Sequence, residues 1–257
     1  MIHFFIYLSK IHPNSNISSH QQKFIDIFDI IVATILNRLF MNHPTAPIET
    51  IGCDFPQTKR GHERRLALLI SANDLFLERG YDAVSLDDIV NHAGGSKASI
   101  YKYFGNKEGL FTAICDYRRE LFFKDVCIPF NPALNEFRTY LINTLITFYK
   151  HMIMPENIAF IRLIFKRSQE DPKLALYIHE KGPAQVQNTI ANALERYAEN
   201  NILKCEQPLY SAQFYFGILR NLEWRILMGV EIKDTDQEIL DCISYCVDRF
   251  LEGHQKV

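Results

Sequence analysis

The stretch SLDDIVNHAGGSKASIYKYFGNKEGL, residues 85–110, places two short helical segments on either side of a glycine pair. Ser85 and Asp88 have the spacing of a capping box, which predicts that a helix begins here. Gly94 and Gly95 follow where the chain must leave that helix, because glycine tolerates positive φ, and the next serine can cap a second helix immediately. Two short helices joined by so short a linker predict a helix-turn-helix.

The second predicted helix has two different faces. Ile100 and Phe104 are four residues apart and share one side, whereas Ala98, Tyr101 and Lys102 point away from it. A small, basic and aromatic face fits a DNA major groove, because lysine neutralises phosphate and a tyrosine hydroxyl can bond a phosphate oxygen. The candidate DNA-binding residues are Ser85, Ser96, Lys97, Ala98, Ser99, Tyr101, Lys102, Tyr103 and Lys107. Among them we expect the largest contributions from Lys97, Tyr101 and Lys102.

Over residues 59–111 the chain resembles the TetR family of bacterial transcriptional regulators. The linked positions that carry this resemblance are Ala72, Phe76, Gly80, Tyr81, Ile89, Ala93, Gly94, Ser96, Ile100, Tyr101, Phe104, Lys107 and Leu110. The resemblance implies an all-α fold, with an N-terminal three-helix helix-turn-helix DNA-binding domain followed by a helical-bundle domain for ligand binding and dimerisation. Gly95 departs from the family, which usually has an apolar residue there, so we expect a looser turn.

The resemblance also implies a mechanism and partners. The protein would be a homodimer that binds a palindromic, double-stranded operator and represses transcription until a small-molecule effector binds the C-terminal domain and releases it. Three alternatives stay open: an activator of the same fold, a regulator that responds to cysteine oxidation, and a helical enzyme or carrier.

The rest of the chain has a helical pattern without the alternation of a β-strand. Helices are expected at about 107–126, 134–152, 156–169, 172–179, 183–200, 209–229 and 236–251, and prolines suit the first turns of several of them. The predicted division is an N-terminal extension over 1–57, a DNA-binding domain over 58–107 and a ligand-binding and dimerisation domain over 108–257.

Residues 1–40 lack the early basic region and the small-residue cleavage site of a signal peptide. The apolar run FIDIFDIIVATILNRLF contains Asp26, Asp29 and Arg38 and is too short and too charged for a membrane span. Two interpretations stay open, namely translated upstream sequence before a start at Met41, or an extra amphipathic helix. We therefore expect a cytoplasmic protein with no membrane partner.

Charge gives a weak indication of a DNA-binding segment. The formal net charge is -2, which provides no general attraction to nucleic acid. Residues 58–107 hold eight Lys and Arg against six Asp and Glu, so a slightly basic segment sits in an acidic chain. Asymmetry this small is also typical of solvated surfaces.

No sequence motif indicates catalysis, a cofactor or a metal. The six cysteines include no CxxC pair, and the nine histidines have no clustered ligand spacing. A Walker loop, a dinucleotide-binding glycine pattern and a GxSxG motif are also absent. Cys242 and Cys246, four residues apart on a predicted helix, are expected to be small apolar residues in a reduced protein. The expectation is therefore a protein that is not an enzyme and has no cofactor and no metal.

Charges within apolar, aromatic stretches of the C-terminal part predict a pocket for an apolar or anionic effector. The candidate ligand-binding residues are Phe148, Phe160, Arg162, Phe165, Tyr177, Arg220, Glu223 and Trp224. Packing in a helical core is the competing explanation for the aromatic residues, and an ion pair between Arg220 and Glu223 is another.

The last two predicted helices are the candidates for a dimer interface, because the resemblance implies a four-helix bundle between subunits. The candidate residues are Phe214, Ile218, Ile239, Ile243, Cys246, Val247 and Phe250. Those of the last helix form an apolar stripe at helical spacing that must be covered. Burial against the same subunit is the competing explanation.

Overall fold

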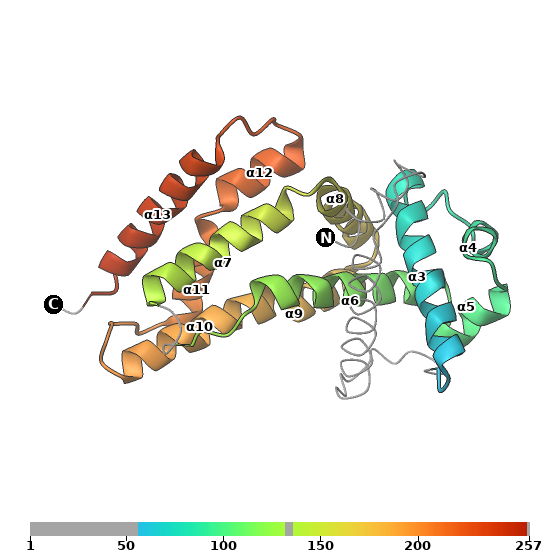
Figure 1. Ribbon diagram of the computed structural model, residues 1–257, viewed down its shortest axis with the longest axis horizontal. Helices are drawn as coiled ribbons and strands as arrows, with labels where there is room; N and C mark the ends of the chain where they lie inside the picture. The colour runs from blue at the N-terminus through green and yellow to red at the C-terminus, as the bar shows by residue number, and fades with distance from the viewer. Residues whose placement is uncertain (1–55, 132–135, 256–257) are drawn as a thin grey trace, which may run out of the picture. The chain divides into compact units, whose positions relative to one another are not determined.

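The computed structural model describes residues 56–131 and 136–255, which contain helices and no β-strand (Figure 1). The first three helices are α3 (Lys59–Arg79), α4 (Leu86–Ala93) and α5 (Lys97–Phe104), and we call them the head. Helix α6 (Lys107–Val126) connects the head to the helices that follow. Most of the predicted extension over 1–57, with both of its interpretations, lies outside the described residues.

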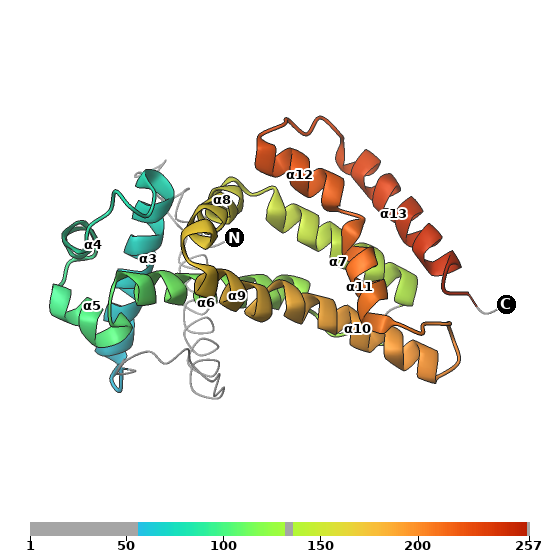
Figure 2. The ribbon, with the colours of Figure 1, turned by 180° about the vertical axis from the view of Figure 1, so that it is seen from behind.

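The remaining helices form what we call the body. They are α7 (Phe137–Met152), α8 (Pro155–Glu170), α9 (Pro172–Lys181), α10 (Pro183–Glu199), α11 (Pro208–Gly217), α12 (Arg220–Met228) and α13 (Asp236–Glu252). Helix α7 packs on α13, and α10 packs on α11 (Figure 1 and Figure 2). None of the described helices combines the length and the apolar character needed to cross a membrane.

Local signals in the sequence set most helix starts. The side-chain oxygens of Thr58 and Asn106 accept hydrogen bonds from the backbone N–H groups of Gly61 and Gly109, at 3.2 and 2.7 Å, and so cap α3 and α6. Helices α8 to α11 each begin with a proline, whose missing N–H costs nothing in a first turn. The proline starts predicted at 155, 172, 183 and 208 and the predicted bounds of α6 are therefore confirmed, whereas Pro132 lies outside the described residues and α7 begins at Phe137.

The single helix predicted over residues 209–229 is wrong, because the chain breaks between α11 and α12. The backbone N–H groups of Ile218 and Leu219 bond to carbonyls three residues back, on Tyr215 and Phe216, at 3.2 and 3.3 Å. Such bonds tighten the turn, and Gly217 is a poor helix former at this point. The Leu219 side chain at the break is fully buried, so tertiary packing holds the kink in place.

A hydrophobic cluster in the head extends beyond the helix-turn-helix. Its fully buried members include Leu68, Ile89, Ile100, Leu110 and Phe111, from α3, α4, α5 and α6. The same cluster takes in Phe160, Leu163 and Leu174, from α8 and α9. The head therefore shares its core with the first body helices, while the predicted domain boundary after residue 107 stays a prediction.

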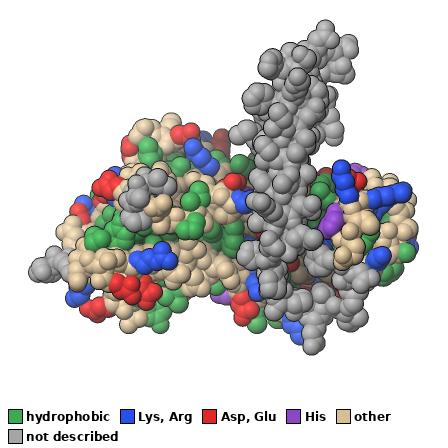
Figure 3. All heavy atoms as spheres, turned by 60° about the horizontal axis from the view of Figure 1, so that its bottom comes forward, with side chains coloured by type: hydrophobic (Ala, Val, Ile, Leu, Met, Phe, Trp, Pro, Cys, Tyr) green, Lys and Arg blue, Asp and Glu red, His purple; other side chains and the backbone are tan. Residues whose placement is uncertain are grey.

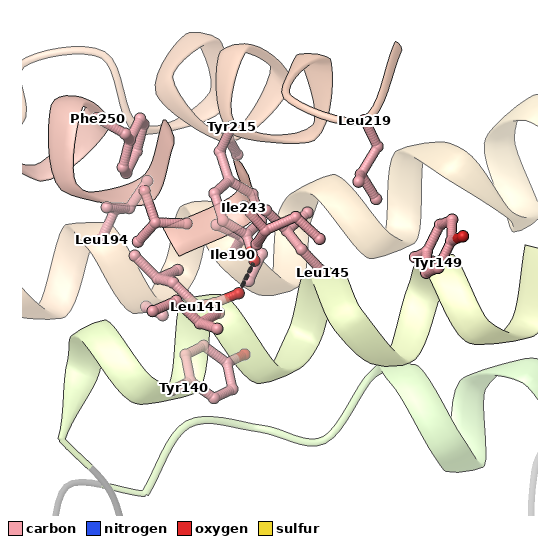
Figure 4. Packing of buried hydrophobic residues seen from close by; sticks show 14 of the residues in the cluster. Tyr140, Leu141, Leu145, Tyr149, Ile190, Leu194, Tyr215, Leu219, Ile243 and Phe250 are labelled. Carbon is pink, nitrogen blue, oxygen red and sulfur yellow. Dashed lines mark hydrogen bonds between the residues drawn. The ribbon is translucent and has the colours of Figure 1, made fainter. Parts of the chain in front are cut away.

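The second hydrophobic cluster fills the body around Tyr215 of α11 (Figure 4). Leu141 and Leu145 of α7, Ile190 and Leu194 of α10 and Ile243 of α13 are buried around it. The Tyr215 hydroxyl donates a hydrogen bond of 2.6 Å to the backbone carbonyl of Leu141, and burial raises its pKa well above the ordinary value. A buried hydroxyl needs such a partner, so this bond fixes α11 against α7.

Removing this hydroxyl should destabilise the body. We expect Tyr215→Phe to lower the free energy of unfolding by about 1 kcal/mol, since a net intramolecular hydrogen bond contributes about that much. Tyr101→Phe is the control, because Tyr101 lies on α5, outside the body, with 53% of its surface exposed. Urea unfolding of both variants measures the difference, and equal stabilities would contradict the role of the bond.

Candidate nucleic-acid interface

The capping box predicted at the start of α4 is present. The Ser85 hydroxyl accepts a hydrogen bond from the Asp88 N–H at 3.1 Å, and the Ser85 N–H donates one to the Asp88 carboxylate at 2.7 Å. The Ser85 hydroxyl also donates to that carboxylate, and these bonds lower the pKa of Asp88. The N–H and hydroxyl of Ser85 are thus engaged within the head.

The turn between α4 and α5 contains two glycines with different roles: Gly94 allows a positive φ, and Gly95 leaves room for the Arg64 side chain. Gly94 has φ +67°, in the region that only glycine enters readily. Gly95 has no such requirement, but a Cβ there would lie 3.1 Å from Nη1 of Arg64. Where the family usually has an apolar side chain, a guanidinium from α3 lies beside the turn.

Helix α5 has the two faces that its sequence predicts. Ile100 and Phe104 are buried in the head cluster, while Ala98, Tyr101 and Lys102 are exposed. Tyr101 keeps 53% of its surface accessible, so its hydroxyl is available to a partner. This division of α5 is confirmed, and contact with DNA stays a prediction.

The remaining predicted residues around α5 are less exposed or are engaged with each other. Ser96 is the N-cap of α5 but makes no capping hydrogen bond with its side chain. Its hydroxyl lies 3.2 Å from that of Ser99. Tyr103 is half-buried, with its ring edge-on to Phe104.

The lysines of the predicted interface differ in their availability. Nζ of Lys97 lies 2.8 Å from the Asp87 carboxylate, and this contact raises the pKa of Lys97. Nζ of Lys107 lies 4.2 Å from the centre of the Tyr81 ring, and burial lowers the pKa of Lys107. Lys102 is exposed and has no carboxylate within ion-pair distance among the described residues. Figure 3 shows Lys and Arg side chains at the surface on the side of the head.

The two turn glycines should respond differently to substitution. Gly94→Ala forces a left-handed backbone and should cost about 1–2 kcal/mol of the free energy of unfolding. Gly95→Ala requires only that the flexible end of Arg64 shift slightly, and should leave stability unchanged or raise it by up to about 1 kcal/mol. Thermal or urea unfolding tests the contrast, and an equal loss in both variants would contradict it.

The predicted ligand-binding residues lie in different surroundings. Phe160 belongs to the head cluster, whereas Phe148 packs against the body cluster, with its ring 5.5 Å from that of Phe122. The Tyr177 hydroxyl donates to the Asp116 carboxylate at 2.7 Å, and burial raises the pKa of Tyr177 to about 12. Core packing and an α6–α9 contact therefore account for these three aromatic residues.

The charged candidates also have structural partners. Arg162 donates from Nε to the Leu227 carbonyl at 3.0 Å and from Nη2 to that of Ile226 at 3.1 Å, which satisfies the end of α12. Arg220 and Glu223 form an ion pair at 3.4 Å, as the competing explanation expects, and burial raises the pKa of Glu223.

Phe165 and Trp224, the last two candidates, are exposed. The structure thus gathers the eight predicted residues into no shared cluster.

The apolar stripe of α13 is covered by its own chain, so its assignment to a dimer interface needs correction. Ile239, Ile243, Val247 and Phe250 are all buried in the body cluster, which leaves them no surface for a partner. The competing explanation, burial within the subunit, therefore holds for them. The physical reason is the packing of α13 on α7.

Of the other interface candidates, Phe214 is exposed, while Ile218 and Cys246 are half-buried. Sequence reasoning missed further exposed apolar side chains on α11, α12 and α13. They include Tyr210 of α11, Met228 of α12 and Tyr245 of α13, together with Trp224, which was assigned to ligand binding. Tyr210 and Phe214 are four residues apart, as are Trp224 and Met228, a helical spacing that could have indicated this face.

The described cysteines carry free thiols. Burial raises the pKa of Cys115 to about 12 and that of Cys127 to about 11, and it also raises the pKa of Cys246. Because the thiolate is the reactive form, these three residues are poorly suited to redox sensing at neutral pH.

Two family models match the chain. Residues 68–114 match "Bacterial regulatory proteins, tetR family", and residues 139–255 match "AefR-like transcriptional repressor, C-terminal domain". The first match covers α4 and α5 with parts of α3 and α6, and the second covers most of the body.

Among curated relatives, the transcriptional activator FasR of Mycolicibacterium smegmatis is 44% identical over 52 residues, or 20% of this chain and 24% of FasR. The transcriptional repressor NemR of Escherichia coli is 26% identical over 179 residues, or 66% of this chain and 88% of NemR. The chain spans only about a quarter of the length of several of these relatives, including FasR.

Solved structures share the fold. The flavonoid-responsive regulator FrrA is 28% identical, with a TM-score of 0.67 over 76% of this chain and 98% of FrrA. A TetR-family regulator from Mesorhizobium loti is 20% identical, with a TM-score of 0.68 over 77% of this chain and 100% of its own, which shows a common fold.

Proposed function

Since the chain belongs to the tetR family of bacterial regulatory proteins, we propose that it binds a specific DNA sequence and represses transcription. The observation that carries this proposal is the exposed face of α5, which presents Tyr101 and Lys102 beside a tight glycine turn. A helix of this kind can enter a major groove, where its first turn meets base edges and its lysines meet phosphates.

In this proposal the predicted residues contribute unequally. Tyr101 and Lys102 contact DNA directly, and the short side chains of Ala98 and Ser99 let the helix approach the bases. Lys97 contributes after its ion pair with Asp87 yields to phosphate, because the pair is exposed and therefore weak. Lys107 lies in the first turn of α6, where a phosphate is favoured by the helix dipole.

We propose that the protein acts as a homodimer on a palindromic operator. The support is the exposed apolar surface of α11, α12 and α13, here called the α11–α13 face, formed by Tyr210, Phe214, Trp224, Met228 and Tyr245. Large apolar side chains that recur along helices mark interaction surfaces, and two-fold pairing buries the same face on both subunits. Two-fold symmetry also places the two helix-turn-helix units of a dimer against the two half-sites of a palindromic operator.

The effector proposal rests on the relatives. FrrA is named as flavonoid-responsive, and the family model for residues 139–255 is named for a repressor. We therefore infer that a small apolar or anionic molecule binds residues 108–257 and releases the DNA, in the cytoplasm. To do so it must bind the released state more tightly than the DNA-competent one. An activator of the same fold is the second candidate, since FasR is named an activator.

DNA binding is tested by selecting duplexes from a random pool with the full chain and then measuring the affinity at several salt concentrations. Lys102→Ala should reduce the slope of log affinity against log salt by about 0.9 for each phosphate that is no longer neutralised. Tyr101→Phe should weaken binding modestly and to a similar degree on all duplexes. Lys150→Ala, an exposed cation of α7, is the control. An unchanged slope in Lys102→Ala would show that this face does not meet DNA.

The proposed dimer is tested by introducing a charged residue into the α11–α13 face. Trp224→Glu places a carboxylate in the proposed interface, where burying an unpaired charge is costly, and should convert the dimer to monomers with weaker operator binding. Light scattering after size-exclusion chromatography measures the mass. Phe165→Glu is the matched control, because Phe165 is an exposed aromatic residue outside this face. Dissociation by both variants, or by neither, would contradict the assignment.

A further inference from the structure

The Arg64 guanidinium lies beside Gly95, in the turn between α4 and α5. Gly95 is exposed and does not have the positive φ that requires glycine. What the glycine provides is space, because an added Cβ would lie 3.1 Å from Nη1 and 3.8 Å from Cζ of Arg64. The guanidinium of an α3 residue is therefore held against the turn that connects α4 to α5.

Among the described residues, Arg64 has no carboxylate partner, in contrast to several other cations of the head. Nζ of Lys97 lies 2.8 Å from Asp87, and Arg79 and Lys59 also lie within ion-pair distance of glutamates. Among the described residues no carboxylate lies within ion-pair distance of Arg64, which is only partly exposed. Its guanidinium thus brings an available positive charge to the beginning of α5.

We propose that Arg64 is a phosphate-binding residue of the head, positioned by the space at Gly95. Arg64 then supplies a positive charge in place of Lys97, whose own charge is engaged in the ion pair with Asp87. This inference rests on the proposed DNA-binding function. A guanidinium suits the role, because its planar fork binds two phosphate oxygens and its charge is permanent. Phosphate contacts set the register of a protein on DNA without reading sequence. Arg64 therefore fixes where α5 enters the groove.

The test compares Arg64→Ala with Gly95→Val. The first removes the guanidinium, and the second keeps it but fills the space that it occupies. Lys150→Ala again controls for the loss of one positive charge outside the head. The probes are a duplex selected from a random pool by the parent protein and an unrelated duplex of the same length, titrated at several salt concentrations.

We expect Arg64→Ala to weaken binding to both duplexes by a similar factor, on the order of ten-fold or more, because each subunit of the dimer then neutralises one phosphate fewer. The salt slope should fall by about 2 for the same reason. Gly95→Val should change both quantities in the same direction but by less, since the displaced guanidinium keeps its charge. Lys150→Ala should match the parent protein.

Two results would overturn the inference. One is an unchanged salt slope in Arg64→Ala, which together with a lower melting temperature would show a purely structural role. The other is a weakening confined to the selected duplex, which would indicate a base contact. If the parent protein selects no duplex, the proposed function fails and takes the inference with it. Failure of the inference alone requires a parent that binds DNA.

Discussion

The guanidinium of Arg118, in α6, is partly buried between helices of the head and the body. Its Nη1 donates to Oδ1 of Asn73 in α3 at 3.1 Å, and its Nη2 donates to Oδ1 of Asn157 in α8 at 2.5 Å. The Phe160 ring lies 4.5 Å from the guanidinium carbon. Burial lowers the pKa of Arg118, and a buried charge is tolerated only when its donors are satisfied. Two neutral amides and one aromatic face meet that requirement.

This requirement links four helices. Asn157 donates from Nδ2 to the His151 carbonyl, in the last turn of α7, at 2.7 Å, so the network that begins on α3 reaches α7. Helix α8 also contacts the segment after α3, through an ion pair between Lys166 and Asp82 at 2.8 Å. A shift of α8 relative to α3 must break these bonds or carry α3 along. These discrete polar bonds therefore link the body to the head, in addition to the hydrophobic cluster that the two share.

Local features explain why the head could be predicted from its sequence. The capping box at Ser85, the left-handed Gly94 and the cap at Asn106 act within a few residues and fix α4, the turn and α6. The α11–α12 break and the burial of the α13 stripe depend on tertiary packing, around Leu219 and against α7. The periodicity of the apolar residues in α13 shows that this face must be covered, but it does not show whether the same chain or a partner chain covers it. These residues were therefore predicted as candidates for the dimer interface. For the same reason, the sequence did not show that Arg162 donates hydrogen bonds to carbonyls at the end of a distant helix.

The near balance of charge in the head also follows from local structure. Its carboxylates have defined partners: Asp88 caps α4, Asp87 holds Lys97, and Asp82 pairs with Lys166 of the body. Carboxylates engaged in this way neutralise the cations next to them. The electrostatic potential at the turn and along α5 is then set by cations such as Arg64 and Lys102. A count of charges over residues 58–107 adds the paired and the unpartnered charges together, and it therefore gives only a weak indication of DNA binding. In the proposed function, the surface that meets DNA is defined by the cations that have no carboxylate partner among the described residues. The place of one of them, Arg64, depends on the space at Gly95, 31 positions along the chain.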